Sequence, residues 1–362
     1  MLFTPVTIGT MTVKNRFVRS ATHDYLGHPD GSISDAEIEL YKTLAQNEVG
    51  MIVTAHTYVQ HPYGKAGVNQ NAIYDDRYIE GYRRLAQEVQ AFGCKLVVQI
   101  SHAGRQTLPD CGFTPLAPSS VPEKGSNVIP KEMSEEEIER TIADFASAMI
   151  RVAKSGADGV QLHLAHGFLL SEFLSPYTNR RTDRWGGEVR SRLSIVAEIM
   201  RQAAKEGLGA GDFPVLVKMN ATDGFDGPGY LSLGEVIEAA AFLKELGVAA
   251  IEVSGGHREA PLGAARRGIT SPEKEAYFFG PARAIKEKVN IPVILTGGLR
   301  SRAVMEKVIN EGRIDMVGMS RPFIQEPDLV VRFLNGQEKA ACISCNGCYN
   351  PRGIRCSQIR TK

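Results

Sequence analysis

Two histidines, His163 and His166, stand three residues apart in the stretch "HLAHGFLLSEFLSPYTNRRTDRWGG", where His163 ends the run "DGVQLH". Residues of this type at this spacing could bind a metal ion, donate hydrogen bonds to a substrate, or simply pack. Zinc sites use at least three protein ligands, and no third ligand stands nearby in the sequence. We therefore favour a substrate-binding pair, with a zinc site as the competing interpretation.

Other short apolar runs also carry polar residues or glycines toward their C-terminal ends, namely Gln99, Lys218, Gly297-Gly298 and "GMSR" at 318–321. Glycine turns free backbone N–H groups that can hold an anion, and Arg321 can pair with a phosphate through two hydrogen bonds. A phosphate site together with Gln99 and Lys218 suggests a ring with hydrogen-bonding edges, such as flavin mononucleotide (FMN). Lys218 would then neutralise negative charge that develops at the N1–C2 edge of the reduced flavin.

Four of the six cysteines lie close together near the C-terminus, at Cys342, Cys345, Cys348 and Cys356. This crowding differs from the spread of cysteines in a small disulfide-bonded domain. Four thiolates are the number that a [4Fe–4S] cluster needs. Zinc and free structural thiols are the alternatives.

Positioning these residues requires a fold that brings the ends of many strands together. Eight short apolar runs, rich in β-branched residues, predict strands at 13–21, 50–55, 95–100, 158–163, 214–220, 249–255, 292–298 and 314–320. Most are apolar on both faces, which is typical of buried parallel strands. Helical patterns lie between them, at 75–93, 134–157, 232–248 and 301–312.

This alternation predicts a (β/α)8 TIM barrel over residues 1–335, with the active site at the C-terminal ends of the strands. Residues 3–15 predict a hairpin that covers the opposite end, and residues 336–362 form a short Cys-rich appendage. A doubly wound sheet is the alternative fold. It usually carries a G-x-G-x-x-G fingerprint, which this sequence lacks.

The composition is that of an ordinary globular protein, with 43% hydrophobic and 23% charged residues and a net charge of +1. Nothing in this balance favours nucleic acid or an anionic membrane as a partner. The apolar runs are too short to span a membrane, and the N-terminus does not resemble a secretory signal. We expect a cytoplasmic homo-oligomer.

The motifs "NRFVRSA", "VVQISHAGRQ", "HLAHGFLLSEFLSPYTNRRTDRWGG" and "VGMSRPF" resemble those of the old yellow enzyme family of flavin oxidoreductases. The tail "CISCNGCYNPRGIRC" looks like the iron–sulfur motif of 2,4-dienoyl-CoA reductase and trimethylamine dehydrogenase, although its last cysteine spacing is shorter. The resemblance implies an FMN site. The residues expected to form it are Ser20, Ala21, Thr22, His23, Ala55, Gln99, Lys218, Gly297, Gly298, Gly318, Met319, Ser320 and Arg321.

The resemblance further implies that His163 and His166 donate hydrogen bonds to a carbonyl or phenolate oxygen of a substrate above the flavin. Many ene-reductases place a proton-donating tyrosine where this chain has Phe168, which has no proton to give. Tyr25 matches a substrate-contacting tyrosine of bacterial members and is our candidate donor, with water as the alternative. His23 is expected near the flavin O4–N5 edge.

We therefore expect an FMN-dependent reductase of activated alkenes such as enones or enoyl thioesters, with NAD(P)H or a partner protein as the electron source. One alternative is a dehydrogenase or demethylase that passes electrons to the cluster or to an electron-transfer protein. Another is an electron-transfer subunit of a larger complex. In the loop 257–278, Arg258, Arg266 and Arg267 could meet an anionic substrate such as a CoA thioester, or form a solvated basic loop.

Overall fold

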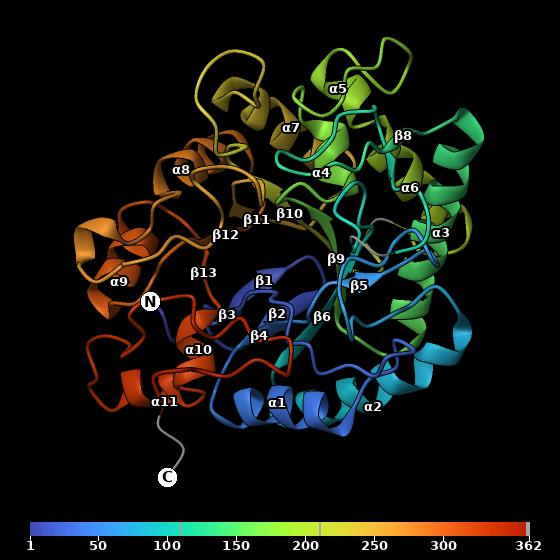
Figure 1. The fold of residues 1–362 in the computed structure, drawn as a ribbon. Coiled ribbons are helices and arrows are strands. Elements are labelled where there is room, and N and C mark those ends of the chain that lie inside the picture. The colour runs from blue at the N-terminus through green and yellow to red at the C-terminus, as the bar shows by residue number, and fades with distance from the viewer. Residues whose placement is uncertain (109–110, 210, 360–362) are drawn as a thin grey trace.

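The computed structural model describes residues 1–108, 111–209 and 211–359. Its centre is a closed barrel of parallel strands surrounded by helices (Figure 1). The barrel strands are β3 Phe17–Arg19, β4 Met51–Val53, β6 Lys95–Ser101, β9 Gly159–Leu164, β10 Val215–Asn220, β11 Ala250–Ser254, β12 Val293–Thr296 and β13 Met316–Met319. Each pairs with the next, and β13 pairs with β3 to close the ring. The predicted (β/α)8 barrel is confirmed.

The helices follow the strands around the outside of the barrel. They are α1 Asp35–Gln46, α2 Ile79–Gln90, α3 Glu135–Lys154, α4 Leu169–Leu174, α5 Val189–Arg192, α6 Ser194–Lys205, α7 Leu233–Glu245, α8 Phe279–Lys288, α9 Arg302–Asn310, α10 Arg321–Gln325 and α11 Leu329–Leu334, with 3-10 turns at Asp76–Tyr78 and Pro272–Lys274. The four predicted helices are confirmed, and α3 begins with a capping box between Ser134 and Glu137. Helices α1, α5, α6, α8, α10 and α11 were not predicted from the sequence.

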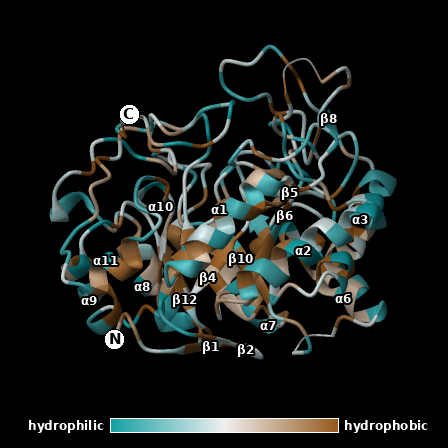
Figure 2. Cartoon of the chain, turned by 90° about the horizontal axis from the view of Figure 1, so that it is seen from below, coloured by the Kyte–Doolittle hydropathy of each residue, from teal (hydrophilic) through white to brown (hydrophobic). Residues whose placement is uncertain are grey.

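The N-terminal hairpin, β1 Val6–Ile8 and β2 Met11–Val13, covers the lower end of the barrel. Its side chains Ile8, Met11 and Val13 share one buried cluster with inward-facing residues of the barrel strands. Figure 2 shows the hairpin on one side of the apolar strands and the long loops on the other. The predicted strand 13–21 was wrong at its beginning, because Val13 belongs to this hairpin. Burying the hairpin seals the bottom of the barrel, so a ligand can enter only from the opposite end.

Besides the hairpin, three further short strands of the described residues lie outside the ring. β5 Thr57–Tyr58 extends the pairing of β6, and β7 Leu116–Ala117 pairs with β8 Lys131–Glu132 in the loop before α3.

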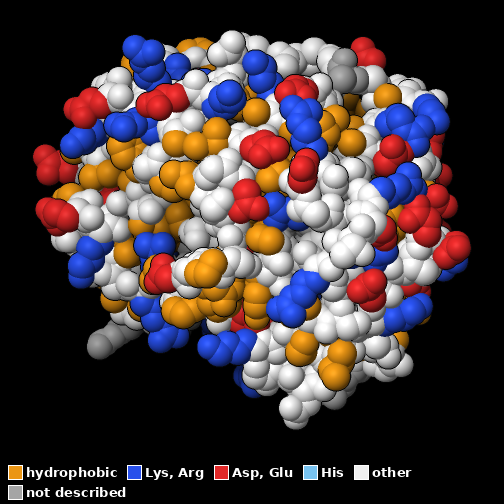
Figure 3. All heavy atoms as spheres, turned by 90° about the horizontal axis from the view of Figure 1, so that it is seen from above, with side chains coloured by type: hydrophobic (Ala, Val, Ile, Leu, Met, Phe, Trp, Pro, Cys, Tyr) orange, Lys and Arg blue, Asp and Glu red, His pale blue; other side chains and the backbone are white. Residues whose placement is uncertain are grey.

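Basic and acidic side chains are interspersed on the face shown in Figure 3. Within the described part of the chain, no helix combines the length and the apolar character needed to cross a membrane.

Candidate active site

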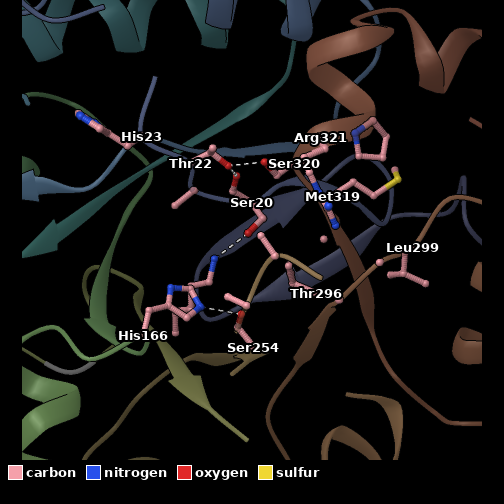
Figure 4. Close-up of a pocket in the computed structure, with 18 of the residues that line it drawn as sticks. Ser20, Thr22, His23, His166, Ser254, Thr296, Leu299, Met319, Ser320 and Arg321 are labelled. Atoms are coloured by element: carbon pink, nitrogen blue, oxygen red, sulfur yellow. Dashed lines mark hydrogen bonds between the residues drawn. The ribbon is translucent and has the colours of Figure 1, made fainter. Parts of the chain in front are cut away.

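A cavity of about 250 Å³ opens at the C-terminal ends of the barrel strands. It is far larger than the second cavity, of about 10 Å³, and only the first has room for an organic cofactor. All but two of the predicted site residues of the barrel line this cavity. The predicted residues that line it are Ser20, Ala21, Thr22, His23, Gln99, His163, His166, Lys218, Gly297, Gly298, Gly318, Met319, Ser320 and Arg321. In Figure 4, Arg321 and Leu299 lie on one side of the cavity, and His166 and Ser254 lie on the other.

Lys218 points into the barrel at the level of the histidine pair, because its Cα pairs with His163 on β9 and with Glu252 on β11. Its Nζ donates to Ser20 Oγ at 2.8 Å and lies 3.1 Å from Glu252 Oε1. Glu252 is fully buried. Burial alone would raise the pKa of this carboxyl, but Lys218 and three hydrogen bonds hold it below its ordinary value. The cavity floor therefore contains a buried ion pair.

The Glu252 carboxylate is the centre of a polar network beneath the cavity. It accepts hydrogen bonds from Ser20 Oγ at 2.5 Å, Gln161 Nε2 at 2.8 Å and Thr296 Oγ1 at 2.8 Å. Gln99 Nε2 in turn donates to Gln161 Oε1 at 2.7 Å. Each member is satisfied, so the network fixes the orientation of Gln99 and Lys218.

His163 and His166 lie side by side, with ring centroids 5.2 Å apart. His166 has a left-handed backbone, with φ of 62°, and its N–H donates to Asn220 Oδ1 at 3.0 Å. Its Nε2 lies 2.8 Å from Ser254 Oγ. Nδ1 of His163 is buried and has no hydrogen-bond partner among the described residues.

Burial lowers the pKa of both histidines, and the neighbouring charge of Lys218 lowers it further. Both rings are therefore neutral near pH 7, and each has one N–H to donate. Among the described residues, no three His, Cys, Asp or Glu side chains are grouped so that they could hold a metal ion. In the described part of the chain the pair therefore stands without a third metal-ligating side chain, and its two neutral rings offer N–H groups at the cavity.

Two predicted residues, Ala55 and Tyr25, are not among those that line the cavity. Ala55 is buried, and its N–H donates to Tyr41 Oη at 2.8 Å. The half-buried Tyr25 ring lies 4.0 Å from the His23 ring, between centroids. Phe168 lines the cavity with its ring 4.5 Å from that of His163.

Sequence reasoning missed several residues of the cavity. His56, Ser254 and Thr296 line it, and Glu252 lies beneath it. Glu252 carried a detectable signal, since it is the only charged residue in the otherwise apolar run "AAIEVSG". His56 directly follows the predicted strand 50–55, and its position there was the signal that could have identified it.

The cysteine tail contributes to the same region. Ser344 and Tyr349 line the large cavity, and Arg321 lines both this cavity and the small one. Arg321 Nη1 donates to Asn346 Oδ1 at 2.7 Å and to the carbonyl of Arg266 at 2.8 Å. The tail therefore packs against the predicted phosphate end of the site.

The four cysteines Cys342, Cys345, Cys348 and Cys356 line the small cavity together. Burial raises the pKa of the Cys342 and Cys348 thiols, whereas the Gly347 N–H lowers that of the exposed Cys345. The folded chain thus gathers all four predicted metal ligands at one place. We find no metal-binding geometry among them in the described residues.

In the loop 257–278, the three arginines differ in their surroundings. Arg258 forms an exposed ion pair with Glu123, and Arg267 is exposed. The Arg266 guanidinium lies 4.3 Å from the centre of the Tyr277 ring. None of the three side chains lines the cavity.

A buried charge cluster beside the cavity gives a pH-dependent prediction. Burial raises the pKa of Glu172 to about 8, although Arg105 lies 3.8 Å away and its N–H donates to the carboxyl at 2.9 Å. Between its ordinary pKa of about 4.3 and pH 8 the folded protein holds one proton more than the unfolded chain. The free energy of unfolding should therefore fall as pH rises, by up to about 1.4 kcal/mol per pH unit from this group.

Denaturant unfolding at pH 6 and pH 8 measures this slope. Glu172→Gln, which stays neutral at both values, should have a smaller slope than the wild type. Glu198→Gln, at a half-exposed helix position, serves as the control. Equal slopes in the wild type and in Glu172→Gln would contradict the assignment.

A closed parallel barrel with a cavity at its C-terminal face has the architecture of the TIM-barrel enzymes, whose active sites lie at this face. Residues 1–340 match the family described as NADH:flavin oxidoreductase / NADH oxidase. The chain is 36% identical to an NADH oxidase of Thermoanaerobacter brockii, over 99% of this chain and 55% of that protein. It is 34% identical to an NADPH dehydrogenase of Bacillus pumilus, over 90% of this chain and 92% of that protein.

A solved structure of 2-naphthoyl-CoA reductase with 2-naphthoyl-CoA has a TM-score of 0.86 and 29% identity, covering 93% of this chain and 52% of that one. The chain thus spans about half the length of that reductase and of the T. brockii relative. It belongs to the NADH:flavin oxidoreductase / NADH oxidase family, which confirms the resemblance to the old yellow enzymes.

Proposed function

We propose that the chain binds FMN in the barrel cavity and reduces activated alkenes, such as enones or enoyl thioesters, with NAD(P)H as the electron donor. The observation that carries this proposal is the pair of neutral histidines beside an inward-pointing lysine, inside a cavity large enough for an organic cofactor. FMN, when bound, supplies the hydride chemistry.

The residues of the cavity fit FMN in kind and arrangement. Arg321 and the glycine turns at Gly297-Gly298 and Gly318 offer a cation and backbone N–H groups for a phosphate. Ser20, Gln99 and Lys218 would face the polar edge of the ring system, held in place by the Glu252 network. Ala21, Thr22, His23, Ala55, Met319 and Ser320 remain proposed contacts.

His163 and His166 would bind the carbonyl oxygen of the substrate. Hydrogen bonds from two fixed donors stabilise negative charge that develops on this oxygen as the β-carbon accepts a hydride. Because both rings are held neutral by burial, they donate hydrogen bonds without needing to titrate. Tyr25 remains our proposed source of the proton for the α-carbon.

The double variant His163→Ala, His166→Ala tests this role. It should lose the long-wavelength absorbance band that we expect when p-hydroxybenzaldehyde binds above the flavin. It should also slow enone reduction by about 10²–10³-fold, the usual effect of removing such a donor. The flavin content should be unchanged. A band that survives in the double variant would remove the proposed role.

We propose as a second candidate a dehydrogenase or demethylase in which Cys342, Cys345, Cys348 and Cys356 hold a [4Fe–4S] cluster that carries electrons to or from the flavin. It is favoured by the small cavity that the four cysteines share with Arg321, which also lines the flavin cavity. Zinc is the alternative ligand for four thiolates.

Protein purified without oxygen distinguishes these possibilities. A cluster should add a broad absorbance beyond the flavin bands and about four iron atoms per chain. Cys345→Ala should lose both while keeping FMN. One zinc atom per chain, or no metal, would exclude the cluster.

We further propose a CoA thioester as one substrate class, because 2-naphthoyl-CoA is bound by a reductase that this chain resembles. Arg258, Arg266 and Arg267 are the candidate contacts for its phosphates. A cytoplasmic location, a homo-oligomeric state and a separate electron-transfer partner remain predictions.

A further inference from the structure

His56 is a cavity residue to which no role has yet been given. It lies in the segment after β4, and its ring centroid is 4.9 Å from that of Phe168 and 5.1 Å from that of His23. Only 9% of the residue is exposed, and it lines the large cavity. It therefore places a polar ring beside the phenylalanine that replaces a tyrosine.

The hydrogen bonds around His56 determine which ring nitrogen carries the proton. Gln70 Oε1 accepts from the Ala66 N–H at 2.7 Å, so the NH₂ end of this amide must point toward His56. There, Gln70 Nε2 lies 2.8 Å from His56 Nδ1 and 3.1 Å from the His56 carbonyl. An amide N–H can only donate, so Nδ1 must accept.

The ring is also neutral, because burial lowers the pKa of His56 well below its ordinary value, as do His23 and His166. A neutral imidazole whose Nδ1 accepts carries its proton on Nε2. Nδ1 faces Gln70 and Ser101 Oγ, which lies 3.3 Å away. Nε2 has no hydrogen-bond partner among the described residues, although the residue lines the cavity.

We infer that His56 is a specificity-determining residue whose Nε2–H binds a second acceptor on the substrate, a carbonyl or carboxylate distinct from the oxygen held by His163 and His166. Substrates with two acceptors would thereby be preferred over simple enones. This inference rests on the proposed oxygen-binding role of His163 and His166.

The same geometry argues that His56 is not a proton donor to the substrate. Releasing the Nε2 proton would leave an imidazolate unless Nδ1 gained a proton at the same time. A protonated Nδ1 would meet the NH₂ group of Gln70, which cannot turn without losing its bond to Ala66. Gln70 therefore fixes His56 as a permanent hydrogen-bond donor.

Ligand binding to the flavin-loaded protein tests the inference. Phenol has one oxygen, whereas ortho-, meta- and para-hydroxybenzaldehyde add an acceptor at three different positions. His56→Phe should weaken the binding of at least one isomer by about 3- to 10-fold, as expected for one neutral hydrogen bond, and change phenol binding by less than about twofold. His56→Gln, which keeps an N–H donor, should restore part of this loss.

His61→Phe is the matched control, since it makes the same exchange at an exposed position in the same segment. An equal effect of His56→Phe on phenol and on all three isomers, or no effect on any of them, would overturn the inference. Failure of phenol to bind the wild type would instead overturn the role of His163 and His166.

The proton position can be measured without any substrate. In protein with ¹⁵N-labelled histidine, the His56 signals, identified by their loss in His56→Gln, should show an unprotonated Nδ1 and a protonated Nε2. Gln70→Leu should give a mixture of the two tautomers. A wild-type His56 protonated at Nδ1 would overturn the inference even where the binding data agreed with it.

Discussion

Replacing Glu252 with leucine is expected to lower the free energy of unfolding of the flavin-free protein by about 3–5 kcal/mol. The Lys218 ammonium would then be buried with only Ser20 Oγ as a partner, because its counter-charge 3.1 Å away would be gone. Ser20, Gln161 and Thr296 would also lose their common acceptor. Denaturant unfolding of the protein stripped of flavin measures this change.

A double-mutant cycle separates the charge from the packing. Lys218→Met should remove the need for a counter-charge, so Glu252→Leu should cost much less in that background than in the wild type. Glu252→Gln should lower the free energy of unfolding by less than Glu252→Leu does, since glutamine keeps the shape of the side chain and some of its hydrogen bonds. If Glu252→Leu costs the same with and without Lys218, the ion pair does not stabilise the cavity floor.

Tyr25→Phe is expected to slow the reoxidation of reduced flavin by an enone by about 10²–10⁴-fold, the usual contribution of a general acid. Hydride transfer to the β-carbon must be completed by a proton at the α-carbon, and Phe168 cannot provide it. Burial raises the pKa of Tyr25, so its hydroxyl keeps its proton at neutral pH. Flavin reduction by NAD(P)H should be nearly unchanged.

Stopped-flow measurement of each half-reaction is required, because slow flavin reduction would hide the step in steady-state turnover. Phe168→Tyr provides the reciprocal test and should accelerate reoxidation by placing a hydroxyl beside His163. If neither substitution changes the rate, the proton comes from water or an enone is not the natural substrate. The dehydrogenase alternative would then be favoured.

The barrel and most of its cavity were predictable because parallel strands bring their carboxyl ends to one face. His163 and Lys218 lie near the C-terminal ends of β9 and β10, and Arg321 follows β13, so this topology places them at the same end of the barrel. It is harder to predict which of two neighbouring residues at the end of a strand has its side chain in the cavity. Ala55 was the predicted residue, whereas the neighbouring His56 is the one that lines the cavity.

Contacts between segments that are distant in the sequence could not be predicted, because they depend on strand register and tertiary packing. Glu252 was visible as a charge in an apolar run, but its pairing with Lys218 depends on the register between β10 and β11. Ser344 and Tyr349 line the cavity because the tail folds back against the loop 257–278, where Gly268 N–H donates to the Ser344 carbonyl and Asn346 Nδ2 donates to the Ala265 carbonyl. No local sequence pattern encodes this contact. Local sequence patterns therefore predicted the helices and strands. The part of the cavity that is lined by the tail depends on tertiary packing.

The contribution of the tail to the cavity limits how far the protein can be shortened. A truncated chain that ended at residue 335 would retain every barrel strand, yet it would lack Ser344 and Tyr349 from the rim of the cavity. Arg321 would also lose the side-chain oxygen of Asn346, Oδ1, which accepts a hydrogen bond from its guanidinium. A shortened version of this scaffold that keeps the cavity as it is lined here must therefore extend at least to Tyr349, whether or not the cysteines hold a cluster.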